Sequence, residues 1–252
     1  MRYFIEFRYS GKAYCGWQRQ PHQSTVQQTL EHALSVLLRE PIEVTGAGRT
    51  DTGVNASFYV AHFDCIVAIA DIPFLLSKLN FMLPGDIAIG RIYLVRSDAH
   101  ARYKALEREY RYYIEVRKNP FTRDTAWQYY VPLDVEQMNL AAAILLERED
   151  FTSFAKLNSD NKTNICHLKC AEWHFESEDV LCFTIRADRF LRNMVRAIVG
   201  TLVDVGRGRY TVEQFREIVD SRDLARSSAG APAQGLFLSK VTYPNDLEIK
   251  EN

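Results

Sequence analysis

The chain has 252 residues, enough for one large domain or two modest ones with a substantial apolar core. Hydrophobic residues make up 47% of it and charged residues 25%, as in an ordinary folded globular protein. The net charge of −1 excludes a polycation, so any contact with nucleic acid must come from local charge. Its longest apolar run is too short to cross a bilayer, and a strand pattern follows Met1 in place of a signal peptide, so we expect a cytoplasmic protein.

Strand and helix patterns alternate in the first half of the chain. Apolar and polar residues alternate in four segments and predict strands at residues 2–9, 41–45, 57–63 and 86–95. Ser24 followed by Gln27 forms a capping-box pattern, which predicts the start of an amphipathic helix. Asp71 and Pro73 predict the start of a second helix.

The second half repeats this order. The same alternation predicts strands at residues 109–116, 164–175, 180–187 and 235–243. Asp134 is placed to cap one helix, and residues 190–205 form the strongest helical pattern of the chain, ended by Gly206. Thr211 and Gln214 then predict the capping box of a short extra helix.

Each half therefore has the order β-α-β-β-α-β, which predicts an α+β protein made of two ferredoxin-like halves. Their antiparallel sheets are expected to pack side by side around a central basic cleft, the natural place for a large ligand. This order predicts an N-terminal subdomain at residues 1–100, a C-terminal subdomain at 101–245 and a tail at 246–252. No low-complexity linker separates the halves, so we expect them to pack tightly.

The five cysteines do not indicate a disulfide framework, because their number is odd and the chain is long. Cys166, His167, Cys170 and His174 are close in sequence, but their spacing suits no common metal motif. The segment alternates like a strand, which would send Cys166 and His167 to opposite faces. We therefore expect no metal site.

Basic residues gather in two segments. Residues 96–118 hold seven basic and four acidic side chains, and residues 186–209 hold six arginines and two aspartates. Such runs are most often solvated surfaces, but tyrosines between the arginines favour a partner that carries phosphates.

The glycine-rich loop GAGRTDTGVNA, residues 46–56, is the most unusual stretch. Its glycine spacing fits neither a P-loop nor a dinucleotide fingerprint, because no Lys-Ser/Thr pair and no helix follow. Asp51-Thr52-Gly53 matches the aspartic-protease tripeptide, but a second copy is absent from the sequence and Arg49 would oppose a shared proton.

Covalent catalysis by a single carboxylate is the third interpretation of this loop. Burial in a closed site raises a carboxyl pKa, whereas a neighbouring guanidinium lowers it and keeps the group ionised. A nucleophilic Asp51 would thus need a cationic partner, and the glycines would let a bulky substrate approach the backbone. An Arg49–Asp51 ion pair that only stabilises a turn remains an equal alternative at this point.

Six segments resemble the tRNA pseudouridine synthase A family, in that family's order and over residues 3 to 243. They are GWQRQ with TVQQTLEHAL, GAGRTDTGVNA, HARYKALEREYRYYI, DFTSF, FLRNMVRAIVGTLVDVG and APAQGLFL. The resemblance implies an enzyme that isomerises uridine to pseudouridine in tRNA, at positions 38 to 40 of the anticodon arm, without cofactor or metal. It also implies a homodimer.

The resemblance assigns roles to five residues. Asp51 matches the nucleophile, and Tyr110 matches the active-site tyrosine that stacks on the base and is a candidate for proton transfer. Arg196 matches the basic partner of the aspartate, Arg49 the arginine that helps to hold the target nucleotide out of its stack, and Leu236 an apolar wall of the uracil pocket. These roles fit the physics of RNA modification, because a stacked base must leave its stack to be reached.

Two further arginines and one departure complete the sequence-based interpretation. Arg102 and Arg207 are chosen as tRNA contacts from charge clustering alone. Asn55 stands where the family usually has a histidine, so an obligatory acid or base role for that histidine is in doubt here. The alternatives are a non-catalytic RNA-binding module and a related synthase that acts on another RNA.

Overall fold

The computed structural model describes residues 1–156 and 162–249. The chain forms two units: Met1–Leu106 together with the chain from Leu238 onward, and Glu107–Phe237. Over the described residues there are nine strands and five α-helices, which confirms the predicted α+β class. The two units are described one after the other.

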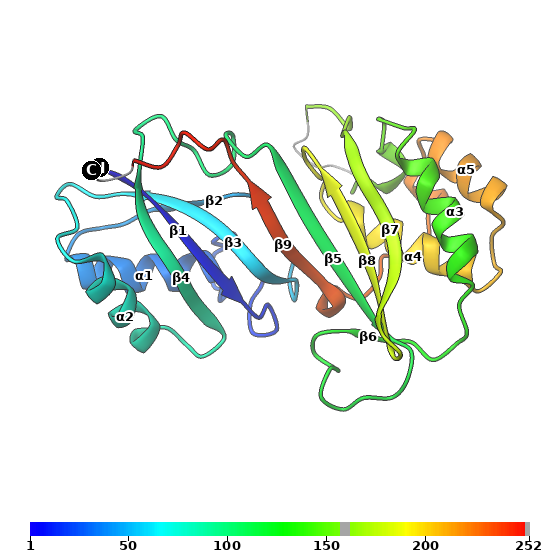
Figure 1. The fold of residues 1–252 in the computed structure, drawn as a ribbon, viewed down its shortest axis with the longest axis horizontal. Coiled ribbons are helices and arrows are strands. Elements are labelled where there is room, and N and C mark those ends of the chain that lie inside the picture. The colour runs from blue at the N-terminus through cyan, green and yellow to red at the C-terminus, as the bar shows by residue number, and fades with distance from the viewer. Residues whose placement is uncertain (157–161, 250–252) are drawn as a thin grey trace. The chain divides into compact units, whose positions relative to one another are not determined.

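In the first unit, β1 (Arg2–Tyr9) is the centre of an antiparallel sheet. It pairs with β3 (Asn55–Asp64) on one side and with β4 (Ile87–Val95) on the other, and the short β2 (Val44–Gly46) pairs with β3 (Figure 1). The part of β9 (Leu236–Thr242) that belongs to this unit lies next to β3. All four strands predicted here from alternation are present.

Two helices pack on this sheet, α1 (Val26–Leu38) and α2 (Ile72–Met82). Asp71 caps α2 as predicted, since its side chain accepts a hydrogen bond from Phe74 N at 2.8 Å. The predicted Ser24–Gln27 capping box is wrong. Thr25 is the N-cap, and the Gln27 side chain instead bonds Glu31 and the carbonyl of Val44, so it ties the helix to β2.

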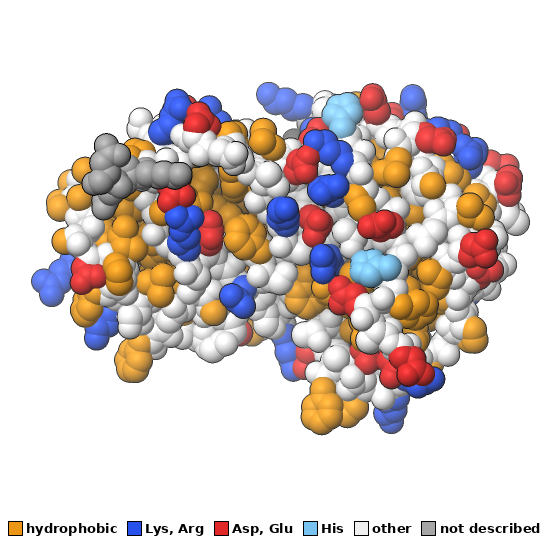
Figure 2. Space-filling model, in the orientation of Figure 1, with side chains coloured by type: hydrophobic (Ala, Val, Ile, Leu, Met, Phe, Trp, Pro, Cys, Tyr) orange, Lys and Arg blue, Asp and Glu red, His pale blue; other side chains and the backbone are white. Residues whose placement is uncertain are grey.

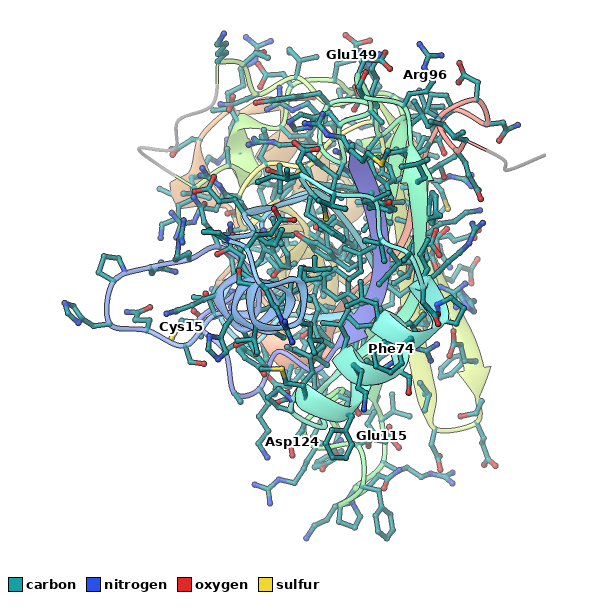
Figure 3. All side chains as sticks on the ribbon, turned by 90° about the vertical axis from the view of Figure 1, so that its left-hand side faces the viewer. Cys15, Phe74, Arg96, Glu115, Asp124 and Glu149 are labelled. Carbon is teal, nitrogen blue, oxygen red and sulfur yellow. The ribbon has the colours of Figure 1, made fainter. Side chains whose placement is uncertain are left out.

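Aromatic rings fill the core of the first unit beneath β1 and β3. Trp17 stacks on Tyr59 with 4.5 Å between the ring centroids, and Phe7 lies 5.1 Å from the same tyrosine ring. All three side chains are buried. This packing fixes the segment after β1, which carries Cys15 and runs beside α1 (Figure 3), against the start of β3.

In the second unit, β8 (Val180–Ala187) pairs antiparallel with β5 (Glu107–Glu115) and with β7 (Leu168–Ser177), and the two-residue β6 (Trp127–Gln128) pairs with β5. The strand predicted from residue 164 begins only at Leu168. Ile165 instead forms an isolated bridge with Asp150, outside the ladder.

Three helices gather beside β7 and β8 (Figure 1): α3 (Val135–Leu145), α4 (Met194–Gly206) and α5 (Val212–Asp220). Asp134 caps α3, and Thr211 with Gln214 forms the capping box of α5, both as predicted. The α4 helix is shorter than predicted. It begins four residues later, because Asn193 adopts a left-handed conformation (φ 65°), and its last residue is Gly206 itself.

Candidate active site

The loop between β2 and β3 carries Asp51 on a tight turn. Val54 N donates to the carbonyl of Asp51 at 3.1 Å, and Ala47 N donates to Val60 O at 2.9 Å. Gly53 has φ 77°, a conformation that side-chain-bearing residues rarely adopt. The Asp51 side chain is half-buried, so this loop presents one carboxylate on a backbone that is pinned at both ends.

Four buried side chains, two of them in the loop itself, hold the loop by hydrogen bonds. The Tyr59 hydroxyl donates to the carbonyl of Gly48, and Tyr9 and Thr50 share a hydrogen bond of 2.8 Å through their hydroxyls. Asn55 is 1% exposed, and its side-chain oxygen accepts from Gly11 N at 2.7 Å. The residue that replaces the usual family histidine therefore holds two loops together.

Gly16 brings a second loop against the back of the turn. A Cβ at this position would lie 2.4 Å from the carbonyl oxygen of Thr50, and the residue has φ 85°. The next residue, Trp17, donates its backbone N–H to the same carbonyl at 3.2 Å. The position of Asp51 thus depends on a close backbone approach that only glycine allows.

Arg49 is exposed at the surface of the same loop. Among residues 1–156 and 162–249, its side chain makes neither an ion pair nor a hydrogen bond. The Arg49–Asp51 pair that the sequence left open is therefore not what stabilises the turn. The neutral hydrogen bonds described above do so.

Tyr110, in the second unit, lies on β5 opposite Ile185 of β8. Its ring is half-buried and stands perpendicular to Phe190, with 5.1 Å between the ring centroids. The edge of Phe190 limits how the tyrosine ring can turn, so the plane of the ring is set by the fold.

Arg196 lies in the first turn of α4 and is bound twice to one residue of the loop before β9. Its Nε donates to the carbonyl of Ala231 at 2.7 Å, and Ala231 N donates to the carbonyl of Arg196 at 2.9 Å. The guanidinium is close enough to Tyr112 to oppose the rise in that tyrosine's pKa, which burial causes. A positive charge is thus held at a fixed place in the second unit.

The remaining predicted site residues occupy both units. Leu236 is buried at the start of β9, directly after Gly235, where a Cβ would meet the Tyr112 ring at 2.8 Å. Arg102 is exposed, with its guanidinium 5.7 Å from the ring centroid of Tyr103. The first unit holds Asp51, Arg49 and Arg102, and the second holds Tyr110, Arg196, Arg207 and Leu236.

Many of the basic side chains in residues 96–118 are paired with carboxylates. Arg96 lies 3.1 Å from Asp98, and Arg111 lies 3.2 Å from Glu176. Figure 2 shows acidic and basic side chains interspersed where β5, β7 and β8 face the viewer. The high basic count of this segment therefore does not translate into a continuous positive surface.

All five cysteines are free, as predicted. Cys166 is buried and His167 exposed, which agrees with the expected opposite orientations. A different set comes together on β7 and β8: one potential ligand atom each of His174, Glu176 and Cys182 lies within 4.8 Å of the others. Arg111 already binds Glu176 there, and burial raises the pKa of the Cys182 thiol to about 12, both of which oppose a cation.

Sequence reasoning missed a cavity of about 250 Å³ in the second unit. It lies where α4 meets the loop before β9, and it includes Arg207 but also Trp127, Arg209 and Ser228. No motif marked Trp127 or Ser228, because they join the arginines only in the folded chain.

Comparison with known proteins bears directly on this arrangement. The sequence model of a family described as tRNA pseudouridine synthase matches residues 141–244. The tRNA pseudouridine synthase A of Parabacteroides distasonis is 50% identical over 246 residues, which are 98% of this chain and 97% of that protein. The protein of the same name from Bacteroides thetaiotaomicron is 52% identical over 99% of this chain and 93% of its own length.

Proteins of lower identity have the same name. The tRNA pseudouridine synthase A of Gloeobacter violaceus is 40% identical over 97% of this chain and 81% of its own length. An α+β chain with a single carboxylate on a supported glycine loop is thus matched from end to end by RNA-modifying enzymes. The chain belongs to the tRNA pseudouridine synthase A family, which confirms the resemblance. Over the residues described, none of its helices is long and apolar enough to span a membrane.

Proposed function

We propose that the protein isomerises uridine to pseudouridine in tRNA, with Asp51 as the nucleophile. The observation that carries this proposal is the half-buried carboxylate on a turn fixed by Gly16, Gly53 and Tyr59, in a chain that its relatives match over almost its whole length. A nucleophile that is held in place loses little orientational freedom when the substrate arrives.

The reaction leaves the composition of the nucleotide unchanged. Asp51 attacks the target nucleotide, the bond from the sugar to the uracil nitrogen breaks, and the free uracil rotates. A bond from the sugar to a uracil carbon then forms and the aspartate is released. That carbon loses a proton and the nitrogen gains one, so the step is a pure isomerisation and consumes no co-reactant.

The other site residues act around this step. Tyr110 offers a ring face for the uracil and a hydroxyl for proton transfer, in the orientation that Phe190 sets. Arg196 is proposed to pair with Asp51 and keep it ionised, since its terminal nitrogens are not used by the bond to Ala231. Leu236 forms an apolar wall, and Arg49 holds the target nucleotide out of its stack.

The fold details belong to the same proposal. The first unit has the element order β1-α1-β2-β3-α2-β4 and the sheet order β4-β1-β3-β2, which supports a ferredoxin-like half. The order β5-α3-β7-β8-α4 supports a second half of the same kind. The basic cleft and the subdomain limits at residues 100 and 245 stay predictions.

We further propose that the substrate is the anticodon arm at positions 38 to 40, that the enzyme acts in the cytoplasm, and that it is a homodimer. The family membership supports these points. Mapping of pseudouridines in total RNA from cells with and without the protein tests the substrate. Loss confined to positions 38 to 40 supports it, and a lost site in ribosomal RNA with unchanged anticodon arms contradicts it.

The function itself is tested with Asp51→Asn. An amide is not a nucleophile, so we expect a folded protein that binds tRNA and releases no detectable tritium from tRNA labelled at the uracil carbon. Asp220→Asn, which makes the same change at an exposed aspartate of α5, is the control and should retain turnover. A non-catalytic RNA-binding module predicts instead that the wild-type protein binds tRNA without any tritium release.

A further inference from the structure

The cavity beside α4 is built by a close approach of helix and loop. A Cβ at Gly200 would lie 2.2 Å from the carbonyl oxygen of Ala229, so the loop rests directly on the helix backbone at this point. A cavity of about 250 Å³ lies at this contact, and both Gly200 and Ala229 line it. Trp127, Asp204, Arg207, Arg209 and Ser228 are among the residues that line it.

Asp204 organises the polar side of this cavity. It is 7% exposed, and its carboxylate accepts from the Ser228 hydroxyl at 2.5 Å. The same carboxylate lies 3.0 Å from Nε of Arg207 and 3.3 Å from Nη1 of Arg209. Two guanidiniums thus share one carboxylate, which leaves one positive charge in excess where the cavity opens.

The two arginines remain accessible. Their side chains are 40% and 56% exposed, so each keeps donors that face solvent. A guanidinium with free donors matches a phosphate group in shape and charge. On the apolar side, the half-buried Trp127 provides an aromatic surface on which a base of any identity can stack.

The size of the cavity indicates what it accepts. Pockets for complete small-molecule ligands measure roughly 300 to 1,000 Å³, so this one suits part of a larger molecule. A single nucleotide of a polymer offers both a phosphate for the arginines and a base for the indole.

Its place on α4 indicates which nucleotide. Ala231, which binds Arg196, is in the lining of the cavity, and Asp204 at its polar side is eight residues, or about 12 Å along the helix axis, from the arginine proposed to act at the target. That distance spans only a few nucleotides, since successive phosphates of one strand in a double helix are about 3.4 Å apart along the axis. We propose that this cavity binds a nucleotide that flanks the target uridine, with its phosphate on Arg207 and Arg209 and its base against Trp127.

This inference rests on the proposed function. It is tested by removing either the positive charge of Arg209 or the negative charge of a single phosphate in the RNA. The wild-type and Arg209→Ala proteins are combined with anticodon stem-loops in which one phosphate at a time is replaced by a neutral methylphosphonate. Affinities are measured in the Asp51→Asn background, so that turnover does not interfere. We expect Arg209→Ala to weaken binding about tenfold and to lower the salt slope by about one phosphate contact.

One neutralised phosphate, within a few nucleotides of the target, should weaken binding to the protein with Arg209 and have little further effect in Arg209→Ala. Arg216→Ala is the matched control, because Arg216 is a 45% exposed arginine that pairs with Glu147 and does not line the cavity. Arg209→Gln, which removes the charge but keeps a polar side chain, should behave like Arg209→Ala. The proposal would be overturned if the effects of Arg209→Ala and of phosphate neutralisation on affinity were additive at every phosphate. An equal loss of affinity in Arg216→Ala would also overturn it. Absence of turnover by the unsubstituted enzyme would instead overturn the proposed function.

Discussion

The Asp51 loop and the α4 region hold their key side chains by different means. Around Asp51 the support is neutral: backbone carbonyls, the Tyr59 hydroxyl and the buried Asn55 amide fix the turn. Around α4 the support includes charge, since Asp204 binds two arginines, and Arg196 is bound by the backbone of Ala231. The turn is thus fixed through its backbone by neutral hydrogen-bond partners, whereas the long arginine side chains of the second unit are positioned by charge, through one shared carboxylate.

The largest expected effect on stability comes from the close approach behind Asp51. Gly16→Ala would force a Cβ to 2.4 Å from the carbonyl oxygen of Thr50 at a positive φ, so we expect a loss of about 3 kcal/mol in the free energy of unfolding and a marked fall in kcat. Gly48→Ala, in the glycine-rich loop, is the matched control, because a Cβ there meets no atom within 4 Å. Urea unfolding and tritium release measure both. Similar effects for the two variants would contradict a specific role for Gly16.

The second prediction concerns pH, which should act through the first unit. Burial, followed by the charge of Arg2, lowers the pKa of His62 to about 4, and its Nδ1 accepts from Ala101 N. Between the unfolded pKa of about 6.5 and the folded value, the unfolded chain binds a proton that the native chain does not. Stability is therefore complete above pH 6.5 and falls as the pH drops toward 4, by up to about 3 kcal/mol.

Urea unfolding of the wild-type protein and of His62→Gln between pH 4 and 8 measures this effect. His167→Gln is the control, since His167 is exposed in the second unit. The His62 variant should lose most of the pH dependence and the control should keep it. An unchanged pH profile in His62→Gln would rule out this histidine as the source.

A smaller effect is expected from the charged support of α4. In Asp204→Asn the amide still bonds Ser228 but no longer attracts Arg207 and Arg209, so we expect a loss of about 1 to 2 kcal/mol in stability. The lost negative charge should raise the affinity for RNA at low salt. The difference in affinity between RNA substrates should become smaller, because the arginines are no longer fixed. Filter binding at two salt concentrations, with Asp220→Asn on α5 as control, measures the change. Weaker binding at every salt concentration would contradict the assigned role of Asp204.

The smallest effect concerns the neutral support of the Asp51 loop. Tyr59→Phe removes one hydrogen bond to Gly48 and keeps the ring stacked on Trp17, so we expect a loss of about 1 kcal/mol in stability. The fall in kcat should exceed any change in KM, because the turn that carries the nucleophile becomes looser. Tyr93→Phe, on β4 of the same sheet, is the control and should leave the rate unchanged.

Local patterns predicted much of this architecture. Asp71, Asp134 and the Thr211–Gln214 pair cap their helices as expected, because a capping side chain bonds its own next turn and needs no distant partner. Thr25 displaced Ser24 as a cap because Gln27 is used by β2, a contact far away in sequence. The start of α4 was misplaced for a similar reason: nothing local requires Asn193 to adopt a left-handed conformation.

The candidate site also contains residues that the sequence predicts and residues that only the structure reveals. The single aspartate among glycines was visible in the sequence, but its supports were not, since Tyr59, Gly16 and Asn55 reach it only through the folded sheet. Arg207 was chosen from charge clustering, whereas Trp127 and Ser228 joined it only in three dimensions. Residues that act within a local motif can be predicted from the sequence, whereas residues that meet only through folding cannot.

The two bonds between Arg196 and Ala231 mean that the conformational entropy of this long side chain is lost during folding rather than during RNA binding. A lysine at this position would keep the charge but has no Nε donor for the carbonyl, so its ammonium would be ordered only when the substrate arrives. Arginine therefore supplies preorganisation here as well as charge, and the entropy lost on folding no longer opposes each catalytic cycle.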